Sequence, residues 1–149
     1  MNILVSVDFS NATGHLMRVA RNVAGRSPVH VYLLHVADPE PDFMGYGAGP
    51  EVVRDQVAKS YQKEHRHLQE LGEELRTSGM QVTALTVQGA IVETVLEQAD
   101  KLDAAFIVVG SHGHGAVYDL LVGSISEGIV RKSKRPVLVV PVKDDNDDE

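Results

Sequence analysis

Residues 29–36 read VHVYLLHV, a nearly continuous apolar run with the length of a β-strand. A strand without a polar side is expected where helices cover both faces of a sheet, as they do in parallel sheets. Residues 2–8, NILVSVD, form another apolar and β-branched run. Between the two runs, apolar residues from Ala12 to Val23 recur with a helical period that stops at Gly25. The chain therefore opens with a strand, a helix and a second strand.

The same alternation continues to the end of the chain. A Pro- and Gly-rich stretch at 38–50 predicts a loop, and the pattern after it predicts a long helix at roughly 51–78. The remaining segments read as strands at 80–87, 104–109 and 136–142 and as helices at 91–99 and 124–135. Prolines beside the last strand suit the edge of a sheet. Strands alternating with helices predict an open, doubly wound α/β fold, in which ligands bind at the carboxyl ends of the strands.

Composition narrows the function classes. The 149 residues include no cysteine, so disulfides and thiolate metal sites are excluded. Five acidic residues in the last six positions account for all but two of the seven net negative charges, and no basic stripe for nucleic acid is found. No signal-like or membrane-spanning run is present. We expect a cytoplasmic protein with one domain at 1–143, a disordered acidic tail at 144–149, and no nucleic-acid or membrane partner.

A glycine-rich segment, VVGSHGHGAVYDLLVGSIS at 108–126, links a strand pattern to a helix pattern. Glycine lets a ligand approach the backbone closely, and a helix N-terminus presents free N–H groups and a partial positive charge. The segment therefore predicts a site for phosphate or another anion. Its spacing does not fit the dinucleotide fingerprint G-x-G-x-x-G, and the lack of G-K-[ST] excludes the lysine-bearing P-loop.

The spacing Gly110, two residues, Gly113, nine residues, Gly123-Ser124 matches G-2x-G-9x-G-[ST]. The sequence therefore resembles the nucleotide-binding members of the universal stress protein family, and the likeness runs from end to end. Other landmarks in family order are Asp8-Phe9-Ser10, LLHV at the end of the second strand, and KRPVLVV near the chain end. The predicted fold is a Rossmann-like parallel sheet of five strands in the order 3-2-1-4-5, with helices on both faces. The resemblance makes 1–143 a nucleotide-binding domain and implies a homodimer formed through the last strand, 136–142.

The resemblance also assigns roles to residues by position. It implies that Asp8 contacts adenine and that Val36 lines the base. It places ribose and phosphates beside a first set of backbone positions, Val109, Gly110 and Gly113. It places phosphates beside a second set, Gly123, Ser124, Ile125 and Ser126. The implied ligand is ATP, ADP or AMP, with Mg²⁺ bound to phosphate oxygens because the glycine segment lacks a lysine.

Some of these residues also have purely structural interpretations. Asp8 is a residue type that forms a strand-to-helix turn beside Ser10. Ser124 and Glu127 fit a capping box, S-x-x-E, with Ser124 as the helix N-cap. Gly128 in the same predicted helix is unfavourable by about 1 kcal/mol relative to alanine and is expected to loosen the helix.

The histidines do not predict a metal centre. His65 and His67 lie two positions apart on a predicted helix, so their side chains diverge. His112 and His114 have no carboxylate at the usual ligand spacing and are expected to be polar loop residues near the phosphates. No nucleophile elbow and no lysine in the glycine loop are present, so no catalytic residue is assigned.

Three functions remain as hypotheses. The first is a nucleotide-binding, stress-response regulatory protein that acts by binding ATP. Protein partners, which the sequence does not identify, would recognise its nucleotide-bound state. The alternative is a weak Mg²⁺-dependent ATPase or phosphotransferase. The third is an interaction protein without a nucleotide, which the intact glycine pattern argues against.

Overall fold

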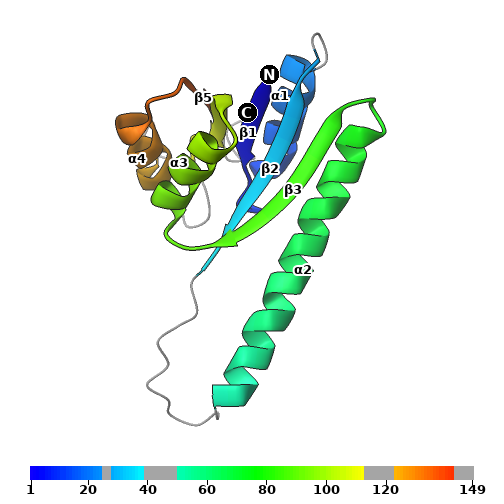
Figure 1. Ribbon diagram of the computed structural model, residues 1–149, viewed down its shortest axis with the longest axis vertical. Helices are drawn as coiled ribbons and strands as arrows, with labels where there is room; N and C mark the ends of the chain where they lie inside the picture. The colour runs from blue at the N-terminus through cyan, green and yellow to red at the C-terminus, as the bar shows by residue number, and fades with distance from the viewer. Residues whose placement is uncertain (25–27, 39–49, 113–122, 143–149) are drawn as a thin grey trace, which may run out of the picture.

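The computed structural model describes residues 1–24, 28–38, 50–112 and 123–142. Strands and helices alternate along them, as the sequence predicts (Figure 1). The elements are β1 (Asn2–Ser6), α1 (Thr13–Ala24), β2 (His30–Ala37), α2 (Pro50–Arg76), β3 (Gln81–Gln88), α3 (Ile91–Lys101), β4 (Ala104–Gly110), α4 (Ser124–Lys132) and β5 (Val137–Val140). The last helix and the last strand are both shorter than the sequence pattern suggested.

The strands form one parallel sheet in the order β3-β2-β1-β4-β5, which confirms the predicted topology. Val5 of β1 pairs with Leu33 of β2 on one side and with Val108 of β4 on the other. β1 is thus the central strand, with β2 and β3 added on one side of it and β4 and β5 on the other. The strand order reverses at β1, where folds of this type bind ligands.

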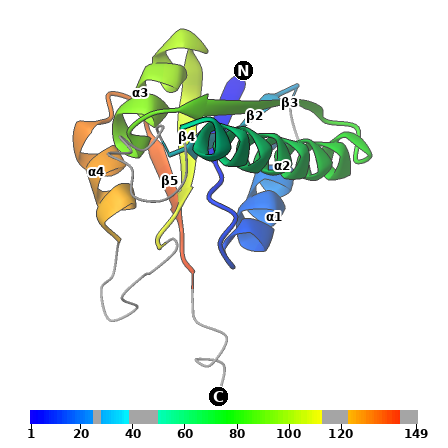
Figure 2. The same ribbon diagram turned by 90° about the horizontal axis from the view of Figure 1, so that it is seen from below.

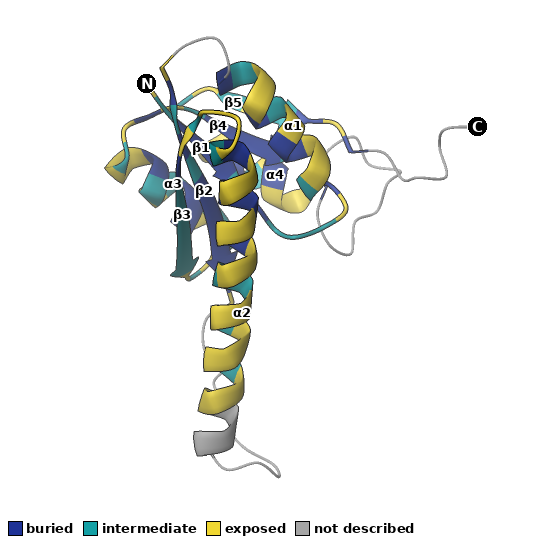
Figure 3. Ribbon diagram, turned by 90° about the vertical axis from the view of Figure 1, so that its right-hand side faces the viewer, coloured by how far each residue is buried: buried dark blue, intermediate teal, exposed yellow. Residues whose placement is uncertain are grey.

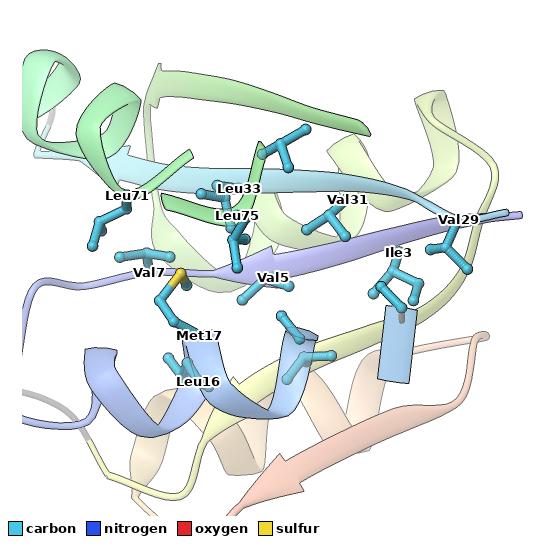
Figure 4. Packing of buried hydrophobic residues seen from close by; sticks show 14 of the residues in the cluster. Ile3, Val5, Val7, Leu16, Met17, Val29, Val31, Leu33, Leu71 and Leu75 are labelled. Atoms are coloured by element: carbon cyan, nitrogen blue, oxygen red, sulfur yellow. The ribbon is translucent and has the colours of Figure 1, made fainter. Parts of the chain in front are cut away.

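Helices cover both faces of the sheet because the strands carry apolar side chains on both sides (Figure 2). Ile3 and Val5 pack against α1 and α2, whereas Leu4 between them packs against α3 and α4. Figure 4 shows the first of these two cores, in which Leu16 of α1 and Leu75 of α2 meet the sheet. Burying one such Leu or Ile side chain contributes about 1.5–3 kcal/mol.

The outer edge of β3 is covered by side chains from α2. The hydroxyl of Tyr61 donates a hydrogen bond of 2.6 Å to the carbonyl of Thr86. Nearer the other end of the strand, the Arg76 guanidinium donates to the carbonyl of Val82 at 2.8 Å. These bonds occupy strand carbonyls that would otherwise be open to another strand. The opposite edge strand is β5, so the predicted edge position of the last strand is confirmed.

Helix α2 is longer than the sheet that it covers. Its C-terminal part packs on the sheet through Leu68, Leu71 and Leu75, while its other end extends beyond the sheet and is mostly exposed (Figure 3). Despite its length, α2 is too polar to cross a bilayer, and no other helix in the described ranges is long and apolar enough.

Gly128 lies where α4 packs closely on α3. A Cβ atom at this position would lie 3.0 Å from Cγ2 of Val92. Besides the unfavourable helix propensity expected of it, this glycine therefore has a packing role, because it allows the two helices to approach. The helix-period pattern could not reveal this, since the partner residue lies on another helix.

Candidate functional site

A pocket of about 600 Å³ opens at the carboxyl ends of β1, β2 and β4, beside the start of α4. These three strands are adjacent and parallel, so their carboxyl ends meet at one edge of the sheet. The structure brings eight of the nine predicted binding residues together in the pocket lining: Asp8, Val36, Val109, Gly110, Gly123, Ser124, Ile125 and Ser126. The ninth, Gly113, lies outside the described residues.

Asp8 forms the turn that leads from β1 to α1. Its Oδ1 atom accepts a hydrogen bond of 2.9 Å from the N–H of Ser10. The carbonyl of Ser10 then accepts from the N–H of Thr13, where α1 begins, at 3.0 Å. Asp8 therefore has the turn role that its residue type suggested, and it also lines the pocket.

Phe9, which follows Asp8, adopts a left-handed backbone conformation with φ of 60°. For a residue with a side chain this region costs about 1–2 kcal/mol. The Phe9 ring is stacked on the His67 ring, with centroids 4.6 Å apart and an interplanar angle of 11°. It also lies 4.5 Å from the His35 ring at 42°. These ring contacts offset the backbone cost and fix the turn.

His35 on β2 is buried in the pocket wall and contacts two acceptors. Its Nδ1 atom lies 2.9 Å from the carbonyl oxygen of Val7, and its Nε2 atom lies 3.0 Å from Oε2 of Glu64 on α2. Both His35 and Glu64 line the pocket. Sequence reasoning placed His35 only within a strand and did not single out Glu64. The available signal was a histidine inside an apolar run, which requires a polar partner when buried.

The end of β4 and the start of α4 are joined through their backbones. The N–H of Gly123 donates to the carbonyl of Ser111 at 2.6 Å. A Cβ atom on Gly123 would lie 3.2 Å from that carbonyl oxygen, and one on Gly110 would lie 3.3 Å from the carbonyl oxygen of His112. Gly123 therefore allows a close approach of the two segments that a larger residue would hinder, whereas Gly110 leaves room for a carbonyl group two residues further along its own segment.

Helix α4 begins with free backbone donors. Gly123 is its N-cap, with an extended conformation, and Ser124 is the first helical residue. The predicted capping box is therefore wrong: no side chain caps this end, and Glu127 instead pairs with Arg131 at 2.7 Å. The first bond within the helix runs from the N–H of Glu127 to the carbonyl of Gly123, so the N–H groups of 124–126 have no partner inside it.

The Ser126 hydroxyl is buried and directed toward the backbone. It donates to the carbonyls of Ser111 at 2.9 Å and of Gly123 at 3.1 Å. Since a hydroxyl has one hydrogen, that hydrogen is shared between these two acceptors. The side chain thus fastens the start of α4 to the end of β4.

His112 forms part of the pocket wall and is 8% exposed. Its Nδ1 atom lies 3.1 Å from the Ser111 hydroxyl, which accepts a hydrogen bond of 2.9 Å from the N–H of Val142. This chain of contacts ties the histidine to the segment after β5. His114 lies outside the described residues.

The rest of the lining is apolar and includes Leu16, Val36, Ile91, Val109 and Ile129. These side chains come from both faces of the sheet and from three helices. They give the pocket apolar walls of the kind that bind a flat organic ring, while the polar groups supply orientation.

The charged side chains in the described lining are acidic: Asp8, Asp38 and Glu64, with no lysine or arginine. Its remaining titratable groups are the imidazoles of His35 and His112. Across the described parts of the chain, no cluster of three or more His, Cys, Asp or Glu residues could hold a metal ion. A polyanionic ligand would therefore need its charge balanced by backbone N–H groups, by a cation that it carries, or by a protonated histidine.

Comparison with known proteins finds a match to the family described as the universal stress protein family over residues 1–141. A Thermus aquaticus universal stress protein is 29% identical over 93% of this chain and 96% of its own. The solved structure of MJ0577 from Methanocaldococcus jannaschii is similar with a TM-score of 0.85, at 26% identity over 96% of both chains. An Archaeoglobus fulgidus universal stress protein solved in complex with dAMP has a TM-score of 0.63 at 20% identity, covering 93% of this chain and 96% of its own.

Proposed function

The chain belongs to the universal stress protein family, and on that premise we propose that its pocket binds an adenine nucleotide, with ATP as the first candidate. The protein then acts as a regulatory component of a stress response, through binding rather than turnover. A related universal stress protein has been solved with dAMP, which is an adenine nucleotide. Mg²⁺ is proposed to enter with the phosphates.

The observation that carries this proposal is the assembly of the pocket from separate segments of the chain. Asp8 follows β1 and Val36 lies near the end of β2, yet they share one pocket with the residues at the start of α4. The predicted base contacts and the predicted phosphate contacts are thus brought within the span of one ligand.

The phosphate end is proposed to be the start of α4. The N–H groups of Ser124, Ile125 and Ser126 have no partner within the helix, and the helix dipole adds partial positive charge at this point. Gly110 leaves the adjoining backbone open to a phosphate group.

The base end is proposed to lie near Asp8. Its carboxylate can accept a hydrogen bond from the exocyclic amino group of adenine, whereas the carbonyl of guanine would oppose it. The apolar side chains of Val36 and Ile91 supply the walls for the ring.

Magnesium fits this arrangement because of the acidic lining. The described lining offers no lysine or arginine to balance several phosphate charges. Mg²⁺ commonly binds substrate phosphates together with water and needs few protein ligands. Nucleotide affinity is therefore expected to fall when magnesium is chelated.

The test is direct. Purified protein is denatured and the supernatant is analysed for nucleotide, and calorimetric titrations with ATP, ADP and AMP follow in the presence of MgCl₂. We expect Gly123→Val to weaken ATP binding at least about tenfold, because a side chain there would push the two backbone segments apart.

Gly14→Val is the matched control, since a Cβ atom at Gly14 meets nothing within 4 Å. It should bind ATP as the wild type does. Finding no heat with any of the three nucleotides, and none released on denaturation, rejects the proposal. Magnesium-dependent phosphate release that Gly123→Val abolishes would instead favour a weak ATPase.

A further inference from the structure

We propose that Glu64 is a positioning residue of the pocket that acts through His35. The contact between the two side chains, called the bridge below, is a hydrogen bond only when a proton lies between Nε2 of His35 and the carboxylate of Glu64. The bridge connects α2 to β2 across the pocket wall, with 3.0 Å between Nε2 of His35 and Oε2 of Glu64. The effect of the bridge on ligand binding rests on the proposed nucleotide function, whereas the existence of the bridge does not.

The need for a proton follows from counting donors. The carbonyl oxygen of Val7 can only accept, so Nδ1 of His35 must carry a hydrogen to make its bond of 2.9 Å. If the imidazole were neutral, Nε2 would then be an acceptor facing an ionised carboxylate, which is also an acceptor. A proton between them turns this repulsive contact into a hydrogen bond. Because an imidazole is ordinarily a stronger base than a carboxylate, we assign the proton to His35.

The position of His35 explains why the pocket should respond. Its Nδ1 bonds to Val7, and its ring contacts Phe9, with centroids 4.5 Å apart. Asp8 lies between these two residues in the chain. The bridge from Glu64 therefore fixes the ring that supports both neighbours of the carboxylate proposed to meet the base.

The surrounding charges determine the direction of the effect. Glu64 faces His35 from α2, Asp8 and Asp38 line the same pocket, His112 lines it from the end of β4, and His67 contacts Phe9 from α2. Three of these groups are carboxylates. A proton on His35 therefore makes the lining less negative as well as completing the bridge, and both effects favour an anionic ligand.

The test measures ATP affinity in the presence of MgCl₂ between about pH 5 and pH 8, the range in which histidines titrate. In the part of this pH range in which the bridge loses its proton, the affinity of the wild type for ATP should fall as the pH rises. For one linked proton the fall is at most about tenfold per pH unit. Glu64→Gln should remove this part of the slope, because the amide can donate to a neutral Nε2. Glu64→Ala should bind weakly throughout and have a shallower slope than the wild type, because only the effect of the His35 charge on the lining remains.

Glu70→Gln is the control, since Glu70 is an exposed glutamate on the same helix outside the pocket. It should keep the wild-type slope. A Glu64→Gln profile that retains the wild-type slope overturns the proposed role of Glu64.

A second measurement needs no nucleotide. Nitrogen-15 NMR of the ligand-free protein should find both ring nitrogens of His35 protonated at the acidic end of the range, and the remaining hydrogen on Nδ1 at the basic end, because the carbonyl of Val7 can only accept. A ring that is singly protonated at the acidic end, or that carries its one hydrogen on Nε2 at the basic end, overturns the bridge. If ATP does not bind the wild type at any pH, the nucleotide function fails, and the bridge is then decided by this measurement alone.

Discussion

Gly110, Gly123 and Gly128 are the same residue type, but each has a different role in the structure. Gly123 lets two backbone segments meet beside the pocket, Gly110 leaves room for the carbonyl of His112 at the end of β4, and Gly128 lets α4 pack closely on α3. The first two were identified through their spacing in the sequence. The packing role of the third was missed, because its partner Val92 is distant in sequence and is brought close only by the packing of α3 on α4.

The close contact at Gly128 predicts a specific coupling. Gly128→Val should destabilise the protein by about 1–3 kcal/mol, because the added side chain meets Val92. The same substitution should cost less in a Val92→Ala background, where the opposing methyl groups are absent. Urea unfolding of the two single variants and the double variant measures the coupling. An equal cost in both backgrounds would contradict the assigned contact.

Among elements, α2 has the largest number of roles. It packs on the sheet, covers the edge of β3 and contributes Glu64 and His67 to the pocket region. Its apolar stripe was evident in the sequence, and its predicted ends differ only slightly from Pro50–Arg76. Its hydrogen bonds to β2 and β3 were not evident, because they join α2 to residues on other elements.

The edge contact of α2 predicts a loss of stability. Tyr61→Phe keeps the ring but removes the hydroxyl that donates to Thr86, and it should cost about 1 kcal/mol. Ser60→Ala, at an exposed position on the same helix, should change stability by less than about 0.5 kcal/mol. Chemical denaturation compares the two variants. Similar stabilities for both would indicate that the hydroxyl contact does not stabilise the edge.

The fold could be predicted from the sequence more completely than the contacts at the site, and this difference has a physical cause. Apolar runs and helical periods are local signals, so the sheet order could be predicted once the strand pattern and the family resemblance were combined. The candidate binding residues were assigned through the family resemblance, and they meet in one pocket because they lie at strand ends on one edge of a parallel sheet or at the start of α4. Phe9, His35 and Glu64 could not be grouped in this way. The contact of Phe9 with His35 depends on the turn after β1, and that of Glu64 with His35 depends on how α2 lies across the sheet.

At the scale of the whole molecule, β5 is an edge strand with an apolar sequence, and we propose that a second copy of the chain pairs with it. Leu138 on this strand is 39% exposed, which is unusual for a leucine on a sheet. We therefore expect Leu138→Arg to convert the proposed homodimer into a monomer by placing like charges at the two-fold contact. Gln81→Arg, an exposed position on the opposite edge strand, should leave the dimer intact.

Sedimentation velocity on both variants and the wild type separates these outcomes. A Leu138→Arg protein that sediments as the wild-type dimer would place the subunit contact elsewhere. A wild type that sediments as a monomer at micromolar concentration would reject the dimer itself.

The hydrogen bonds from Tyr61 and Arg76 to the outer edge of β3 limit how many copies of the chain can associate edge to edge. Two molecules joined through β5 would carry β3 on both outer edges, where the carbonyls of Val82 and Thr86 are already bonded to α2. We therefore expect association through β5 to stop at two copies rather than to continue into a filament.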